Sequence, residues 1–317
     1  MAGRPTQGAA WTAGTGPNDR RLSGLTPRQT QRVRDLARQF LAENGLEAVV
    51  HDDHLRTADG REFGLYTLAS KCHNAPLGEG SWPVVVRDYL GGLLAAYPDV
   101  PPPVTEEQLR ERACLRLVNL HSLKPEAYEW YRYARRLGAG FVEMLVLAED
   151  GFARFLNDAD VALVGADELR GIARENLRAI EPDEYELRSK DDTHLHVVRG
   201  ASGFIASKLL MLPEVLAVVP GLRTHYPDGL LVAVPNRHEL AFTPLGLNAP
   251  YDLLALAEYA ALMHTHGEAP LAPFVYWWRD GELTQLTAAD AAGHLTWAAP
   301  YEFVEVIARM WDEPLAS

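Results

Sequence analysis

The run Leu230–Val234 (LLVAV) places the tightest limit on how this chain can fold. All five residues are apolar, so both faces of a strand formed by them need to be buried, and such a strand is predicted to lie in the centre of its sheet. Pro235 ends the run, because proline cannot donate to a sheet ladder. The chain then turns through Asn236-Arg237, which are expected at the edge of the sheet.

The spacing of apolar residues predicts an α+β fold of mixed sheets with packed helices. Thr26 and Pro27 predict a helix start, because threonine caps a helix and proline fits its first position. Tyr251–Met263 is apolar almost all round, which predicts a buried helix. Asp280-Gly281 predicts a two-residue hairpin turn. Strands are expected at Leu46–His51, Glu62–Leu68, Leu115–Leu120, Phe141–Ala148, Ala153–Leu156, Glu184–Ser189, His194–Arg199, Phe274–Arg279 and Glu282–Leu286, with further helices at Trp82–Tyr97, Phe204–Leu212 and Pro300–Trp311.

Composition divides the chain into a tail and two lobes. Residues 1–24 are rich in Gly, Thr, Ala and Pro without periodicity, so we expect a disordered tail. Two α+β lobes are expected over residues 25–160 and 161–317, and Pro98–Pro103 (PDVPPP) predicts an extended connector. The order helix–strand–strand–helix–strand occurs in both lobes, so they would be similar αββαβ units if the chain were duplicated. The same order also arises by chance, and both interpretations stay open.

Charge and cysteine content exclude several classes of protein. The net charge is −13, whereas phosphate contacts need clustered Lys and Arg, so no nucleic-acid partner is expected. Cys72 and Cys114 are too few for a disulfide framework and favour a reducing, cytoplasmic location. No stretch approaches about 18 uncharged apolar residues, so no membrane partner is expected. The phosphate-binding glycine loop, HExxH and CxxC motifs are all absent, and no cofactor is expected.

Three segments carry a resemblance to a known family: GADELRGIARENL (Gly165–Leu177), SGFIASKLL (Ser202–Leu210) and LLVAVPNRHEL (Leu230–Leu240). Together they resemble the YtpQ-like family of uncharacterised bacterial proteins, over about residues 140–290. The resemblance implies a Pro-x-Arg corner followed by an acidic residue, where this chain has His238 and then Glu239. The family supplies no catalytic residues to carry over.

Candidate ligand-binding side chains are Asn236, Arg237, Lys208, His194 and His196. Arginine binds carboxylates and phosphates through two parallel hydrogen bonds. His194 and His196 are two residues apart on a predicted strand, so they point to one face. The same residues also fit structural roles, with Arg237 tying the corner to a neighbouring acid and the histidines on a solvent face. Lys208 and the adjacent serine do not face each other on a helix, so they do not form a simple catalytic pair.

No metal site is expected from the histidines. His51 and His54 flank two aspartates in one turn, and adjacent residues rarely converge on one ion. His264 and His266 end a predicted helix just before Gly267, where protonated histidines complement the helix dipole and glycine caps the helix.

These observations favour a non-enzymatic protein-binding or adaptor module. Catalytic motifs are absent, the chain is acidic, and Trp277 and Trp278 on a predicted strand present one ring to each face, so one is a candidate interface anchor. The alternative is an enzyme of unrecognised class with a small-molecule site near Arg237 and the His194/His196 strand. A deep pocket joining these side chains would favour the enzyme, and a shallow apolar patch with acidic rims would favour the binding module. The sequence leaves the partner and the oligomeric state open.

Overall fold

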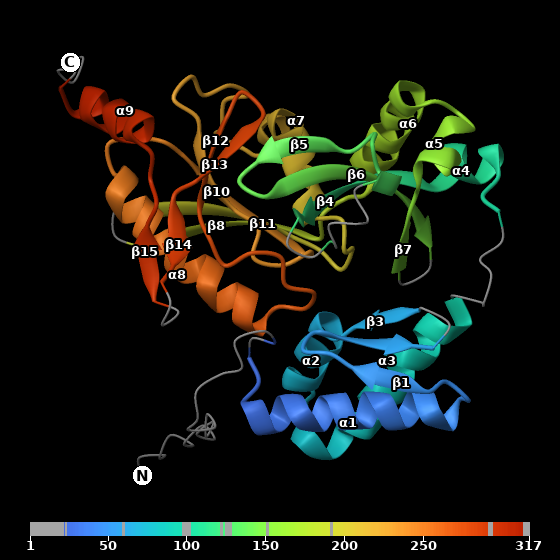
Figure 1. Ribbon diagram of the computed structural model, residues 1–317. Coiled ribbons are helices and arrows are strands. Elements are labelled where there is room, and N and C mark those ends of the chain that lie inside the picture. The colour runs from blue at the N-terminus through green and yellow to red at the C-terminus, as the bar shows by residue number, and fades with distance from the viewer. Residues whose placement is uncertain are drawn as a thin grey trace, which may run out of the picture. The chain divides into compact units, whose positions relative to one another are not determined.

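The computed structural model describes residues 22, 24–58, 61–96, 103–120, 123, 129–149, 152–190, 193–290 and 294–312. The chain divides into two compact units, Met1–Tyr97 and Pro98–Ser317, and Figure 1 shows their helices and strands. The α+β class is confirmed, while every strand pair in the described ranges is antiparallel, so the expected mixed sheets are not found there. The expected tail over residues 1–24 lies almost entirely outside the described residues.

The first unit is built on helix α1 (Pro27–Glu43), which begins where the sequence predicts. The Thr26 hydroxyl accepts a hydrogen bond from the Gln29 backbone N–H (3.4 Å), and the Gln29 side chain accepts one from the Thr26 N–H (3.0 Å), which forms a capping box. The predicted strand Glu62–Leu68 is wrong in its second half, since β3 ends at Gly64 and a helix follows. The other elements of this unit are β1 (Ala48–Val50), β2 (His54–Thr57), β3 (Glu62–Gly64), α2 (Tyr66–His73), η1 (Gly78–Ser81) and α3 (Trp82–Ala96), with strand order β1-β2-β3.

The larger sheet of the second unit has six strands in the order β13-β12-β10-β11-β9-β8. Strand β10 (Leu230–Ala233) lies between β12 and β11 with every residue buried, which confirms the predicted central strand. Leu230 and Val232 face the core that includes η4 and α7, while Leu231 and Ala233 face the core under α8 and α9. The elements are β8 (Glu184–Lys190), β9 (Thr193–Arg199), η4 (Ala206–Met211), α7 (Leu212–Val218), β11 (Glu239–Pro244), α8 (Ala249–His266), β12 (Tyr276–Arg279), β13 (Glu282–Gln285), β14 (Thr287–Ala289), β15 (Leu295–Trp297) and α9 (Tyr301–Asp312).

A second sheet of this unit has the order β4-β6-β5, with β7 also paired to β6. Its elements are α4 (Glu106–Arg112), β4 (Ala113–Asn119), β5 (Arg135–Gly138), β6 (Phe141–Glu149), β7 (Phe152–Phe155), α5 (Asp158–Ala162) and α6 (Ala166–Ala179). Leu169, Ala173 and Leu177 of α6 share a hydrophobic core with this sheet. The lobe boundary expected near residue 160 therefore falls inside the second unit. The first expected αββαβ copy is divided between the two units, since β1–β3 belong to one and β4 to the other.

The predicted hairpin turn is confirmed, whereas the predicted burial of helix α8 on all sides is wrong. The hairpin of β12 and β13 is confirmed, with Asp280 (φ 52°) and Gly281 (φ 88°) in the left-handed region that the two-residue turn needs. Helix α8 is only half buried. Leu253, Leu256 and Ala257 face the sheet, but Tyr251, Leu254 and Leu262 are exposed, so the predicted all-round burial is wrong.

Within the described ranges, no helix is both long and apolar enough to cross a membrane.

Candidate functional site

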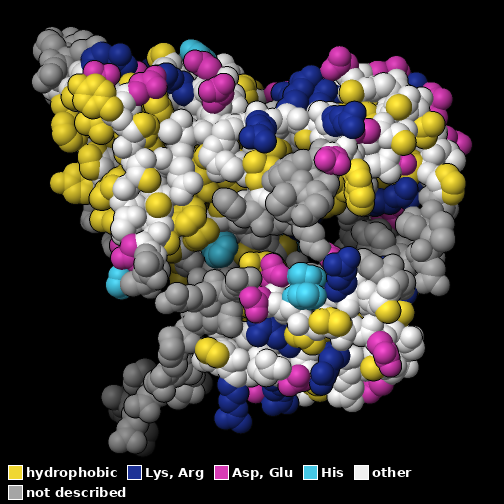
Figure 2. All heavy atoms as spheres, viewed as in Figure 1, with side chains coloured by type: hydrophobic (Ala, Val, Ile, Leu, Met, Phe, Trp, Pro, Cys, Tyr) yellow, Lys and Arg dark blue, Asp and Glu magenta, His cyan; other side chains and the backbone are white. Residues whose placement is uncertain are grey.

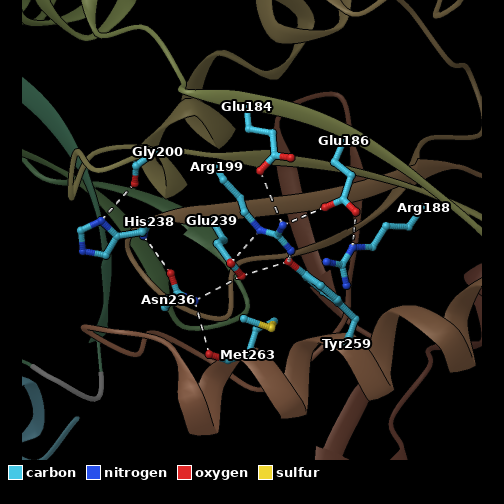
Figure 3. A network of polar contacts seen from close by, with 10 residues as sticks. All are labelled: Glu184, Glu186, Arg188, Arg199, Gly200, Asn236, His238, Glu239, Tyr259 and Met263. Atoms are coloured by element: carbon cyan, nitrogen blue, oxygen red, sulfur yellow. Dashed lines mark hydrogen bonds and ion pairs between the residues drawn. The ribbon is translucent and has the colours of Figure 1, made fainter. Parts of the chain in front are cut away.

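A polar network lies at one end of the six-stranded sheet, where β9 ends and β11 begins (Figure 3). The register of these strands places Arg199 opposite Glu239. The Arg199 guanidinium donates from Nε to Glu239 Oε1 (2.9 Å), from Nη2 to Tyr259 Oη (3.0 Å) and from Nη1 to Glu186 Oε2 (2.8 Å). One guanidinium therefore connects β8, β9, β11 and α8.

Tyr259 closes this network from the α8 side. Its hydroxyl donates to Glu239 Oε2 (3.0 Å) while it accepts from Arg199, so both functions of the hydroxyl are used. Burial, and then the charge of Glu239, raise the pKa of the Tyr259 phenol, which keeps it a donor. The Arg188 guanidinium lies 5.2 Å from the centre of the Tyr259 ring and pairs with Glu186 (3.0 Å).

Asn236, one of the predicted site residues, belongs to the same network and is fully buried. Its Oδ1 accepts from the His238 backbone N–H (2.9 Å), and its Nδ2 donates to Glu239 Oε2 and to the Met263 carbonyl oxygen (both 3.3 Å). The carbonyl belongs to the last turn of α8, so Asn236 ties the corner to the end of that helix. Glu239, the acid that follows the corner, is paired with Arg199.

Arg237 follows at the same corner and is held there through its backbone. Its N–H donates to the Ala269 carbonyl (3.0 Å), and its carbonyl accepts from the Ala206 N–H (3.1 Å). The Arg237 side chain is half-buried.

The network has the features of a structural tie rather than a reaction centre. Glu239, Asn236 and Tyr259 are all buried, and both carboxylate oxygens of Glu239 already accept hydrogen bonds. A buried charge pair is stable when its remaining polar atoms are satisfied in this way. The arrangement therefore fixes the relative position of three strands and one helix.

Lys208 has a similar structural role at another helix end. Its buried ammonium group donates to the carbonyl oxygens of Leu177 (2.8 Å) and Arg178 (3.2 Å), in the last turn of α6. A cation there complements the helix dipole, although burial lowers the pKa of the lysine. The neighbouring Ser207 hydroxyl instead accepts from the Leu117 N–H of β4 (3.0 Å), so the two side chains serve different elements.

His194 and His196 share one face of β9, as the sequence predicts. His196 stacks on Phe242 at 5.5 Å, whereas Leu195 and Val197 pack towards α8. Both histidines line a pocket of about 360 Å³ together with Thr243, Pro244, Gly246, Leu247, Asn248 and Asp252. Burial, and then the nearby His194, lower the pKa of His196.

This pocket does not join the other predicted site residues, because its lining includes neither Lys208 nor the Asn236-Arg237 corner. Among the residues that the structure describes, no group of three or more His, Cys, Asp or Glu side chains is arranged to hold a metal ion.

Three further predictions concern single side chains. Burial lowers the pKa of His264 to about 4, so this histidine is neutral near pH 7 and the predicted charge–dipole interaction at the end of α8 is wrong for it. Cys72 and Cys114 are free and buried, and burial raises the pKa of each thiol to about 12. Trp277 is buried against Phe303 (5.4 Å) and Trp278 is half-buried, so neither is an open interface anchor.

An apolar groove lies on the surface of the second unit, and sequence reasoning missed it. It has a volume of about 460 Å³ and is formed by α9, the start of α8 and the segment around β15. Figure 2 shows hydrophobic side chains gathered at the upper left, over α9, and continuing below it. The lining is entirely apolar or aromatic: Ala249, Pro250, Leu253, Trp297, Ala299, Phe303, Val304, Ile307, Ala308 and Trp311.

The groove is open because helix α9 carries more apolar surface than its own core covers. Phe303 and Val306 are buried in the core under the helix. Tyr301 is 76% exposed, Val304 52% and Trp311 58%, and together with the exposed Ala308 they form a second stripe. At about 100° per residue, the apolar residues span an arc of about 220°, twice the width that one core contact needs. This arc was visible in the sequence and could have identified the groove.

Comparisons with protein-family models, with curated proteins and with solved structures found no match for this chain. The resemblance to the YtpQ-like family therefore stays a prediction.

Proposed function

We propose that this chain is a protein-binding module that docks a helix of another polypeptide into the groove formed by α8, α9 and β15. The observation that carries the proposal is the exposed stripe of α9, where Tyr301, Val304 and Trp311 are each more than half exposed. A helix with an apolar stripe at i, i+3, i+4 and i+7 is the ordinary occupant of a groove lined by such side chains.

The side chains that line the groove and surround it also favour a protein partner. Two exposed tryptophans, Trp297 and Trp311, lie in the lining, and aromatic residues are enriched in the central parts of protein interfaces. Exposed acids, Glu302 and Glu305, lie on the outer side of α9. This combination is an apolar patch with a charged rim, which favours a binding module over an enzyme. The free, buried cysteines accord with the cytoplasmic location expected from the sequence.

The alternative, an enzyme, has less support. Its expected site needs His194 and His196 to share a pocket with the Asn236-Arg237 corner, and the pocket that the histidines line does not reach that corner. Asn236 and Lys208 are moreover bound to backbone carbonyl groups.

A labelled helical peptide tests the proposal. The probe is about 18 residues long, so that it can form a helix in water, with leucine at i, i+3, i+4 and i+7 and equal numbers of Glu and Lys elsewhere. Fluorescence anisotropy is expected to show saturable binding to the full chain. Val304→Arg is expected to weaken binding about tenfold or more, because a charge then faces the apolar stripe.

The matched control is Val218→Arg on α7, where the same change is made at a valine that is 65% exposed and outside the groove. This variant is expected to bind the peptide as the unmodified chain does. Equal binding by all three proteins, or no binding by any, would contradict the proposal.

A further inference from the structure

We propose that the occupant of the groove is α9 of a second copy of this chain, so that two copies associate through antiparallel α9 helices. The inference rests on the proposed function, because it uses the same surface and names its partner. It is carried by the pattern of residues along α9 and by the way the groove lies beside that pattern.

The exposed stripe of α9 is complementary to itself about the level of Val306 along the helix, while the Val306 side chain faces the core of its own chain. When two copies of the helix run antiparallel with this residue at the centre, Tyr301 lies opposite Trp311 of the second copy, and Val304 lies opposite Ala308. Aromatic rings then meet at both ends of the contact, and a larger side chain meets a small one on either side of the centre. Both arrangements favour close packing between helices.

The charged residues of α9 are complementary in the same register. Glu302 and Glu305 precede the centre and Arg309 follows it, so the antiparallel arrangement brings Arg309 of one copy between the two acids of the other. Within one chain, Glu302 pairs with Arg279 and Arg309 pairs with Asp228, and these contacts keep the charges beside the apolar stripe. Opposite charges across an interface fix its register.

The two-fold symmetry of such a pair extends the contact to the groove. In an isologous interface the same patch is used on both copies. The side of α9 that borders the groove, the groove flank, therefore contacts the same side of α9 in the second copy. Trp297 and Pro250, both exposed, line this flank and would be covered from the opposite side by the partner. The interface would then have an apolar centre with a charged rim, as protein interfaces commonly do.

The net charge of the chain predicts how its self-association depends on salt concentration. Each copy carries −13, so the two bodies repel while the apolar contact attracts. Added salt screens this repulsion, and self-association is expected to strengthen with ionic strength. A basic helix from a different protein would show the opposite trend, because salt would weaken its attraction to an acidic surface.

Sedimentation equilibrium of the full chain tests the proposal. The unmodified chain is expected to reach twice the mass of one chain at micromolar concentrations, and Val304→Arg is expected to weaken association about a hundredfold, because it buries a charge in the apolar centre. The control Val218→Arg is expected to associate as the unmodified chain does. Circular dichroism verifies that each variant is folded.

A charge exchange tests the register independently. Glu305→Arg and Arg309→Glu are each expected to weaken self-association about fivefold, because each places like charges across the rim. An equimolar mixture of the two variants is expected to regain association, since the arginine introduced into one chain then faces the glutamate introduced into the other. Failure of the mixture to regain association would contradict the antiparallel register.

The outcomes separate this inference from the proposed function. A chain that stays monomeric yet binds the labelled leucine peptide at the groove would overturn the second copy as occupant and leave the docking function in place. A chain that is monomeric and does not bind the peptide would overturn both. A dimer that persists in Val304→Arg would place the self-association surface elsewhere and would also overturn the inference.

Discussion

Asn236 shows how much of this fold can depend on one side chain. Its amide satisfies the His238 N–H, the Met263 carbonyl and one oxygen of Glu239. Asn236→Ala is expected to lower the free energy of unfolding by about 3 kcal/mol, because buried partners are left without hydrogen bonds. Urea unfolding measures the change. Asn236→Asp is expected to cost at least as much, since it sets a second carboxylate against Glu239, and unchanged midpoints for both variants would contradict this role.

His264 is expected to make stability depend on pH. Its pKa is about 4 in the folded chain and 6.5 in the unfolded chain. Between these values the unfolded state binds a proton that the folded state does not bind, so stability decreases as the pH falls from 6.5 to about 4. His264→Gln is expected to lose less stability over this window, measured as the urea midpoint at each pH. The same pH dependence in both proteins would show that His264 makes no contribution.

At the scale of elements, the end of α8 depends on a glycine for reasons of space. Gly267 has an ordinary φ of −75°, but a Cβ atom there would overlap the Asn236 amide nitrogen and the Met263 carbonyl oxygen. Gly267→Ala is therefore expected to destabilise the chain by about 3 kcal/mol in urea unfolding.

Gly246→Ala, in the segment just before the start of the same helix, is the matched control. A Cβ atom at Gly246 would meet no atom within 4 Å, so its effect is expected to stay within about 0.5 kcal/mol. An equal cost at both glycines would contradict the steric argument.

The sequence predicted elements whose signals are local and missed what depends on distant partners. Thr26 and Asp280-Gly281 act through their own backbone geometry, and both predictions are confirmed. The apolar circumference of α8 predicted burial on all sides. It does not distinguish a helix enclosed by its own fold from one whose outer face is left open, and Leu254 and Leu262 are in fact exposed.

The candidate site was predicted only in part for the same reason. The Asn236 corner was identified as important, but Arg199 and Tyr259, which bind the adjacent Glu239, lie 40 residues before and 20 residues after Glu239, and they meet only through strand pairing and helix packing. The polar character of Arg199 gave no signal of that contact. The wide apolar arc of α9 is present in the sequence, and it was sufficient to predict the groove.

At the scale of the whole molecule, the division into two units followed a feature that the sequence did carry. The proline-rich run Pro98–Pro103 is predicted to be a connector, most of it lies outside the described residues, and the units divide between Tyr97 and Pro98. The chain does not divide near residue 160 as expected, because α6 packs on β4 and β6, which precede that position. Such contacts between segments far apart in sequence also determine the six-strand order, which no local pattern predicts.

Each unit is expected to fold by itself, because each has a hydrophobic core of its own. Fragments of residues 1–97 and 98–317 are each expected to give a cooperative thermal transition by circular dichroism. Loss of cooperativity in either fragment would show that its core needs the other unit.

Photocrosslinking at Val304 tests the central claim, that the exposed stripe of α9 is a docking surface for a helix of another polypeptide. A benzoylphenylalanine in place of Val304, in the full chain at micromolar concentration with the labelled leucine peptide present, is expected to form a covalent adduct with a second polypeptide on illumination. The same group in place of Val218 is expected to form none. Mass spectrometry that finds no adduct to a second polypeptide at Val304, or equal adducts at both positions, would contradict the account.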